Sequence, residues 1–213
     1  GRFCYTPAPF APEVAPLPAV AQGYVTFGCF NNTAKLNPAV LALWARLLQA
    51  VPNARLVLKW RSFHDAGLRQ SVREAVARPG LAPERLELRG ASFHADLLAQ
   101  YADIDIALDP FPFTGGLTSC EALWMGVPVL TWPQSRVVSR QTFALLSAIG
   151  LPELAATDAE DYVRIAVGLA GDVARLKALR AGLRARMRGS VLCDVAGATR
   201  HLEHTLFDLA RQA

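Results

Sequence analysis

The sequence lacks several features that would define its class at once. The cysteines are scattered, with no C-x-x-C pair, at Cys4, Cys29, Cys120 and Cys193. This spacing excludes a disulfide framework and a common zinc site. No apolar run reaches the ~18–20 residues of a membrane span, and the amino terminus does not resemble a signal peptide. We therefore expect a soluble, cytoplasmic protein with no membrane partner.

Lysine is scarce too. It occurs only at Lys35, Lys59 and Lys177, so arginine carries almost all of the net charge of +4. The carboxy-terminal arginines have helix-surface spacing and no interleaved aromatic residues, which favours a solvated helix face over a nucleic-acid surface. His201 and His204 lie three residues apart, but no Cys or carboxylate motif accompanies them, so no metal site is predicted.

The composition that remains is that of a globular protein. The chain has 213 residues, of which 52% are apolar and 19% charged, enough for a sizeable core. Residues 1–22 are rich in proline and predict an extended lead-in that straps across the surface or links to another part. Because the first residue is Gly1 and not Met, we expect the chain to be part of a longer protein.

From Tyr24 onwards, short β-rich runs alternate with helical patterns. Asn37 and Pro38 predict a helix start, as N-cap and first helical residue. Continuous apolar strands are typical of burial on both faces, and the alternation predicts an α/β fold with a doubly wound parallel sheet. Strands are expected at 24–30, 55–60, 85–90, 105–109 and 128–132. Helices are expected at about 37–51, 65–77, 94–102, 119–126, 139–150, 158–170, 173–187 and 196–211.

The loop after the first expected strand reads FNNTAK. Ligands of open parallel sheets bind at the carboxyl ends of strands, near helix amino termini. Asn31, Asn32, Thr33 and Lys35 occupy this place. Lysine is a compact point charge suited to phosphate. The alternative is a polar, asparagine-rich turn with an exposed lysine.

A second candidate site lies in the stretch FPFTGGLTSCEALWMG. Gly115 and Gly116 lack Cβ, so their amides can approach a ligand closely, although a merely tight turn would also use them. Thr118 and Ser119 can cap the helix or bind an anion. Glu121 can accept hydrogen bonds from ribose hydroxyls or simply complement the helix dipole. The stretch matches neither of the common glycine-rich nucleotide motifs, which disfavours those two classes.

Carboxylates offer a rival chemistry, glycoside hydrolysis, which needs a converging pair. Asp103, Asp105 and Asp109 all belong to one strand region, so no such pair is predicted. Asp109 ends its strand at the ligand edge. We expect it to cap the turn that follows, with a direct ligand role as the alternative.

The segments FGCFNNTAKLNPAVLALWARLLQAVPNARLVLK and YADIDIALDPFPFTGGLTSCEALWMGVPVLT resemble the SPINDLY / O-GlcNAc transferase family of glycosyltransferases, and its bacterial tetratricopeptide-containing members more closely. The resemblance covers nearly the whole chain. It implies the Rossmann-like carboxy-terminal lobe of a GT-B glycosyltransferase. Residues 1–22 would be a proline-rich interlobe linker, 23–190 the nucleotide-sugar-binding lobe, and 191–213 a helix packed on that lobe.

The resemblance also implies site residues. Lys35 would be catalytic, through the donor diphosphate, and Glu121 would hold the ribose. The other implied donor-binding residues are Asn32, Gly115, Gly116, Thr118 and Ser119. The chain departs from animal members at Gly116 and Leu117, which replace His-Thr. A family histidine is replaced by Leu97, with His94 one turn earlier.

The implied activity is transfer of a sugar to protein Ser/Thr, most simply GlcNAc from UDP-GlcNAc. GDP-fucose and UDP-glucose are alternative donors. No metal or cofactor is implied, and the acceptor protein would bind through an amino-terminal lobe and repeats. The isolated chain is therefore expected to be inactive. The alternative is a degenerate nucleotide-sugar-binding or interaction module that has lost donor chemistry.

Overall fold

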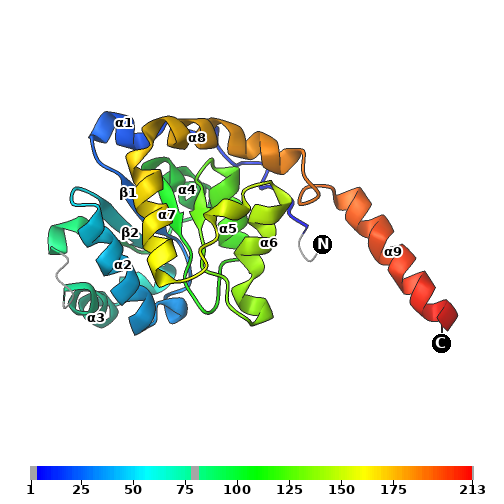
Figure 1. The fold of residues 1–213 in the computed structure, drawn as a ribbon, viewed down its shortest axis with the longest axis horizontal. Coiled ribbons are helices and arrows are strands. Elements are labelled where there is room, and N and C mark those ends of the chain that lie inside the picture. Colours follow the sequence, from blue (N-terminus) through cyan, green and yellow to red (C-terminus); the bar gives the residue numbers. More distant parts are fainter. Residues whose placement is uncertain (1–3, 78–81, 213) are drawn as a thin grey trace.

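Within residues 4–77 and 82–212, which the computed structural model describes, five short strands form one parallel sheet (Figure 1). The strands are β1 (Thr26–Cys29), β2 (Arg55–Lys59), β3 (Leu86–Arg89), β4 (Ile106–Leu108) and β5 (Val129–Leu130). Their order in the sheet is β3-β2-β1-β4-β5. Strands β1 and β4 are neighbours, with Phe27 opposite Ile106 and Gly28 opposite Ala107.

The helices begin close to the predicted positions. Asn37 caps the second helix through a 3.0 Å hydrogen bond from the Val40 amide, and Pro38 is its first residue, as predicted. The α-helices are α1 (Pro18–Gln22), α2 (Pro38–Ala50), α3 (Ala66–Ala77), α4 (His94–Ala99), α5 (Leu117–Trp124), α6 (Gln141–Ala148), α7 (Ala159–Gly171), α8 (Val173–Arg188) and α9 (Val195–Gln212). Short 3-10 helices are η1 (Thr33–Lys35), η2 (Arg61–His64), η3 (Pro83–Arg85), η4 (Gln100–Asp103), η5 (Val137–Ser139) and η6 (Pro152–Leu154).

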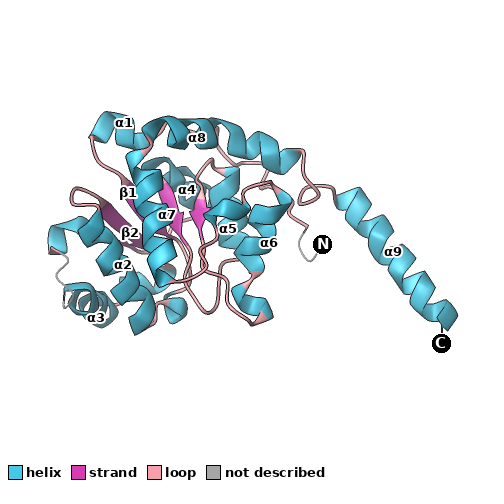
Figure 2. Ribbon diagram, in the orientation of Figure 1, coloured by secondary structure: helices cyan, strands magenta, loops and turns pink. Residues whose placement is uncertain are grey.

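The strand order places helices on both faces of the sheet (Figure 2). The chain runs outward from β1 through β2 to β3, then returns to β4 beside β1 and continues to β5. Because crossovers between parallel strands are right-handed, the crossover helices of the two halves lie on opposite faces. Accordingly, α2 contacts α3 and α7, whereas α5 contacts α6 and α8. The predicted doubly wound α/β sheet is confirmed.

Large aromatic side chains anchor α2 to the sheet. Phe27, Trp44 and Tyr162 are fully buried. Trp44 in α2 donates its indole N–H to the Tyr162 hydroxyl in α7 at 3.2 Å, so both polar tips are satisfied inside the core. Each such side chain contributes roughly 1.5–3 kcal/mol through burial. These contacts fix α2, and with it the loop that joins β1 to α2.

The proline-rich lead-in is bound to the body of the protein and includes the short helix α1 (Pro18–Gln22). Asp105 accepts hydrogen bonds from the amides of Ala19 and Thr26 at 2.9 and 2.8 Å. Arg180 donates to the Ala15 carbonyl at 2.8 Å, and Arg184 donates to that of Pro12. The expectation that the carboxy-terminal arginines form a solvated face was wrong for Arg180, which is buried and also donates to the carbonyl groups of Tyr101 and Ile104.

Helix α9 stands away from the sheet and the other helices (Figure 1). The predicted packing of this helix on the lobe is therefore not observed. Val195, Leu202, Leu206, Phe207 and Leu209 are all exposed, so its apolar stripe finds no surface of the body to cover. No helix of the described part of the chain is long and apolar enough to cross a membrane.

Candidate functional site

Two loops meet at the centre of the sheet's carboxyl edge. Residues 30–37 follow β1 and residues 109–116 follow β4. These neighbouring strands mark the point from which the chain runs in opposite directions across the sheet, and such switch points bind ligands in α/β folds. The Asn37 side-chain amide donates to the Phe111 carbonyl at 2.6 Å and ties the loops together. Both loops predicted from the sequence therefore belong to one site.

Lys35 reaches from the first loop to the second. Its ammonium donates to the Thr114 carbonyl at 3.0 Å and to Asn31 Oδ1 at 3.1 Å, and it lies 4.4 Å from the centre of the Phe113 ring. Burial lowers the pKa of Lys35, and the nearby Asp109 carboxylate opposes this shift. The hydrogen-bond partners are neutral groups, so the charge of Lys35 remains available to an anion.

Asn31 joins three parts of the site. Its side-chain oxygen accepts hydrogen bonds from Lys35 and, at 3.0 Å, from the Thr118 hydroxyl in α5. Asn32, for which the resemblance implied donor contact, is exposed and caps η1 by accepting from the Ala34 amide at 3.0 Å. A donor contact of Asn32 stays a prediction. Asn31 was named with this candidate loop but was not among the implied donor-binding residues, although its place just past a buried strand was the available signal.

Asp109 fixes the second loop from within. Its side chain is buried and accepts hydrogen bonds from the Gly115 amide at 2.6 Å and the Thr131 hydroxyl at 2.7 Å. Burial raises the pKa of Asp109 to about 6, and the hydrogen bonds from the Thr131 hydroxyl and the Gly115 amide oppose this shift. The predicted turn-capping role is confirmed by these contacts.

Two of the predicted donor-binding residues face the interior. The Gly115 amide is engaged by Asp109, and the Gly115 carbonyl accepts from the Thr142 hydroxyl at 3.2 Å. The Ser119 hydroxyl is buried and lies 2.9 Å from that of Thr142. These contacts hold the loop and the start of α5 in place. Direct donor contact by Gly115 and Ser119 remains a prediction.

The open end of α5 is formed by Gly116, Leu117 and Thr118. Gly116 is the N-cap residue, and no side chain of the described residues caps it. Amides of a first helical turn lack partners within the helix, and the helix dipole adds about half a positive charge there. Together with the Lys35 ammonium from the loop after β1, these backbone amides form a positively polarised cluster that suits phosphate oxygens.

Glu121 lies further along α5, where its side chain is only 5% exposed. One carboxylate oxygen, Oε1, is 2.7 Å from His94 Nε2 at the start of α4. Burial raises the pKa of Glu121, and the hydrogen bond and charge of His94 oppose the shift. Glu121 was predicted from the sequence as a ribose-binding residue, whereas no role was predicted for His94. The two residues lie in different helices, so their pairing depends on tertiary packing.

A mostly apolar pocket of about 210 Å³ lies at the carboxyl ends of β2 and β3. Trp60 follows β2, Ser92 and Leu97 flank His94 along the chain, and all three line the pocket. Lys59, at its inner end, is buried and donates to the Gly90 carbonyl at 2.9 Å. A flat heterocycle would find apolar surface and backbone polar groups here.

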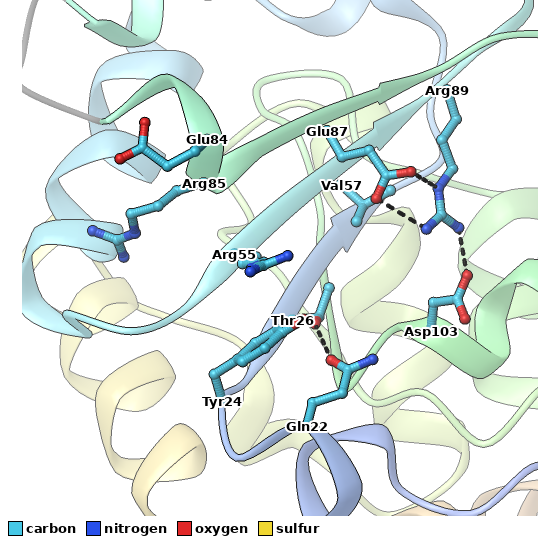
Figure 3. Close-up of a pocket in the computed structure, with 10 residues that line it drawn as sticks. All are labelled: Gln22, Tyr24, Thr26, Arg55, Val57, Glu84, Arg85, Glu87, Arg89 and Asp103. Atoms are coloured by element: carbon cyan, nitrogen blue, oxygen red, sulfur yellow. Dashed lines mark hydrogen bonds and ion pairs between the residues drawn. The ribbon is translucent and has the colours of Figure 1, made fainter.

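A second cavity, of about 200 Å³, lies at the opposite, amino-terminal edge of the sheet (Figure 3). Most of its charged groups already form ion pairs or hydrogen bonds within the protein. Arg89 pairs with Glu87 at 2.8 Å and Asp103 at 2.7 Å, and Arg85 donates to three carbonyl groups at the end of α2 and just beyond it. Because ligands of such sheets bind at the carboxyl edge, the carboxyl edge is the better candidate.

The site thus combines a lysine, an uncapped helix start, a buried carboxylate and an apolar pocket. A diphosphate would suit the lysine and the uncapped helix start. A ribose would suit the buried carboxylate, and a nucleobase would suit the apolar pocket. Among the described residues, no group of three or more His, Cys, Asp or Glu side chains is arranged to hold a metal ion.

Comparison with known families agrees with this geometry. Residues 17–202 match the family described as Glycosyl transferase family 41. The chain belongs to glycosyl transferase family 41. The family match spans the whole sheet and both ligand-edge loops, so the resemblance read from the sequence is confirmed.

Family 41 relatives are similar along almost the whole chain. A probable UDP-N-acetylglucosamine–peptide N-acetylglucosaminyltransferase SPINDLY of Petunia hybrida is 42% identical over 211 residues, which are 99% of this chain and 23% of the relative. Its counterpart in Arabidopsis thaliana is 44% identical over 193 residues, 90% of this chain and 21% of the relative. The chain therefore spans less than a quarter of the length of these curated relatives.

Solved structures show the same fold. The K341M mutant of Thermobaculum terrenum O-GlcNAc transferase superposes with a TM-score of 0.86 at 41% identity, covering 94% of this chain and 38% of that one. Sucrose-phosphate synthase from Thermosynechococcus elongatus is only 17% identical, with a TM-score of 0.66 over 99% of this chain and 52% of its own, and shares the fold alone. This family 41 chain is thus a Rossmann-like lobe of the GT-B type.

Proposed function

We propose that this chain is the donor-binding lobe of a glycosyltransferase that transfers a sugar to Ser or Thr hydroxyls of a protein. UDP-GlcNAc is the first donor to test, because relatives over the whole chain bear the name UDP-N-acetylglucosamine–peptide N-acetylglucosaminyltransferase. The observation that carries the proposal is the Lys35 ammonium, held by neutral oxygens beside the open start of α5.

The chemistry needs a group that stabilises a departing nucleoside diphosphate. As the acceptor oxygen attacks the anomeric carbon, the bond from that carbon to the diphosphate oxygen breaks and negative charge grows on the phosphate. Lys35 and the first-turn amides of α5 are already in place, so they stabilise this charge without reorganisation and without a metal. Removal of one such group typically costs a factor of about 10²–10³ in rate.

The remaining groups would hold the nucleoside. Glu121 offers carboxylate oxygen to the ribose hydroxyls, as acidic residues do in related nucleotide-binding folds. The pocket formed by Trp60, Ser92 and Leu97 then receives the base. Its lining combines aromatic and aliphatic surface with backbone groups, so a uracil and a guanine are both candidates for the test. The acceptor protein would contact parts of the longer protein beyond this chain.

Calorimetry with UDP, UDP-GlcNAc, GDP and GDP-fucose tests donor binding. We expect at least one nucleotide to bind the wild-type chain and Lys35→Ala to weaken binding at least tenfold, because it removes a charged contact. Lys177→Ala is the matched control, since Lys177 is an exposed lysine on α8. Failure of all four ligands to bind at millimolar concentration would contradict the proposal.

The Gly116–Leu117 departure motivates a second candidate, a module that keeps the fold without donor chemistry. The two candidates separate in the longer protein. A donor lobe loses transferase activity by about 10²-fold or more in Lys35→Ala, whereas a degenerate module is unaffected. Incorporation of radiolabelled sugar into acceptor protein measures the difference.

A further inference from the structure

His94 and Glu121 form a pair that bridges the start of α4 and the middle of α5. The Nε2–Oε1 distance is 2.7 Å, and the exposed fractions of the two side chains are 47% and 5%. The carboxylate is therefore buried, whereas the imidazole is about half exposed. Because Oε1 is engaged by His94, the second oxygen is the one free to turn towards a ligand.

The imidazole also contacts an aromatic ring of the proline-rich lead-in. The ring of Phe10, in the proline-rich lead-in, lies edge-on to His94, with 5.4 Å between ring centres and 83° between planes. Phe10 is in turn positioned by the segment whose Pro12 and Ala15 carbonyls receive hydrogen bonds from Arg184 and Arg180. The lead-in therefore supports the orientation of His94.

Recognition of a ribose depends on the state of the carboxylate. A carboxylate accepts hydrogen bonds from hydroxyl groups with both oxygens, whereas its protonated form donates from one of them. Burial raises the pKa of Glu121 and so favours the protonated form, and His94 opposes this. Removal of His94 would leave a buried carboxylate with less to keep it ionised.

We propose that His94 is a positioning residue for nucleotide binding, which holds the Glu121 carboxylate ionised and turned so that its free oxygen receives the ribose hydroxyls. The inference rests on the proposed function and adds to it a residue outside the donor-binding loops. It also makes the lead-in, through Phe10, part of the donor site.

Three titratable groups that face Glu121 stay neutral at and below neutral pH. Tyr5 from the lead-in, Tyr101 from η4 and Cys120 from α5 all interact electrostatically with Glu121. Burial raises the pKa of both tyrosines above their usual value and that of Cys120 to about 12. Asp96 follows His94 on α4. Asp109, whose pKa is raised to about 6, and the ligand phosphates affect the ribonucleotide and its dideoxy analogue alike, so the ratio of the two affinities between pH 4 and 8 reports on the pair.

The test compares UDP and GDP with their 2′,3′-dideoxy analogues by calorimetry on the wild-type chain and its His94→Ala and His94→Gln variants. We expect His94→Ala to weaken binding of the ribonucleotide about 5- to 10-fold and to leave the dideoxy analogue unchanged. His94→Gln should recover most of the loss, because its side-chain N–H can donate to Glu121. Circular dichroism checks that each variant is folded.

The pH profile gives a second readout. In His94→Ala the pKa of Glu121 rises further, so binding of the ribonucleotide should fail at a higher pH on acidification than in the wild type. The acid limb of His94→Gln should stay near that of the wild type. His204→Ala is the matched control, because His204 pairs with Asp208 on the exposed helix α9, at 3.4 Å.

Two failures are distinguishable. If the wild-type chain binds neither ribonucleotide, the proposed function fails and the role of His94 with it. If the wild type prefers ribonucleotides but His94→Ala keeps that preference, or loses both ligands equally, only the role of His94 is overturned. Absence of rescue by His94→Gln would overturn it as well.

Discussion

The two edges of the sheet both carry charge, but they use it differently. In the cavity on the amino-terminal side, Glu87 and Asp103 are both paired with Arg89, which extends from the last position of β3 (Figure 3). At the carboxyl edge, Lys35 is held by a carbonyl and an amide oxygen, and Asp109 by an amide and a hydroxyl. Charge held by neutral dipoles remains free to act on a ligand. The comparison explains why a cavity with many charged residues is the poorer candidate site.

Removal of one carboxylate from each edge should show the difference in stability. We expect Asp109→Ala to lower the free energy of unfolding by about 2–4 kcal/mol, because it strands the Gly115 amide and the Thr131 hydroxyl inside the protein. Glu87→Ala should cost less than about 1 kcal/mol, since its ion pair with Arg89 is partly exposed. Urea unfolding measures the free energy of unfolding of the two variants. Equal losses would contradict the distinction between the edges.

The pH dependence of stability should have opposite sign at the two edges. The pKa of Asp109 is raised to about 6 by burial, so the folded state binds the extra proton and stability falls as pH rises from about 4 to 6. The pKa of Glu87 is lowered, chiefly by its hydrogen bond from Arg89, so its contribution is present at neutral pH and is lost on acidification.

Asparagine and glutamine variants isolate these two contributions. Relative to Asp109→Asn, the wild-type chain should lose roughly 2–3 kcal/mol of stability between pH 4 and 7. Relative to Glu87→Gln, it should gain stability over the same range. Urea titrations at each pH provide the measurement, and slopes of the same sign would refute the assignment.

A smaller effect is expected from a methyl group at the carboxyl edge. At Gly115 a Cβ would overlap the Ser119 hydroxyl and approach Asp109 Oδ1 to 3.1 Å. We expect Gly115→Ala to cost about 1–2 kcal/mol and to weaken nucleotide binding. Gly168→Ala is the control, because a Cβ there meets nothing within 4 Å on the exposed face of α7, and it should stabilise by about 0.5–1 kcal/mol. Thermal unfolding distinguishes the two.

Local signals predicted the fold and the place of the site well. The helix start at Asn37 and Pro38, the strand alternation and the glycine-rich turn are encoded within a few residues, and the structure confirms each. Contacts between distant segments were not predictable in this way. The choice of Asn31 over Asn32, the pairing of His94 with Glu121 and the burial of Arg180 all depend on tertiary packing. The packing of the terminal helix on the lobe, which the resemblance implied, is not observed, and its apolar side chains are exposed.

The shared oxygen of Asn31 also has a consequence for folding. Its bond to Thr118 joins residues 87 positions apart, and the bond from Lys35 to Thr114 joins residues 79 positions apart. Contacts so far apart in the chain form only after long loops have closed, so the cluster of Asn31, Lys35, Thr114 and Thr118 is completed late, when β4 has docked beside β1. A partly folded intermediate with either half alone has no binding site. Nucleotide binding would therefore stabilise the finished native state alone and would serve as a kinetic marker for its arrival.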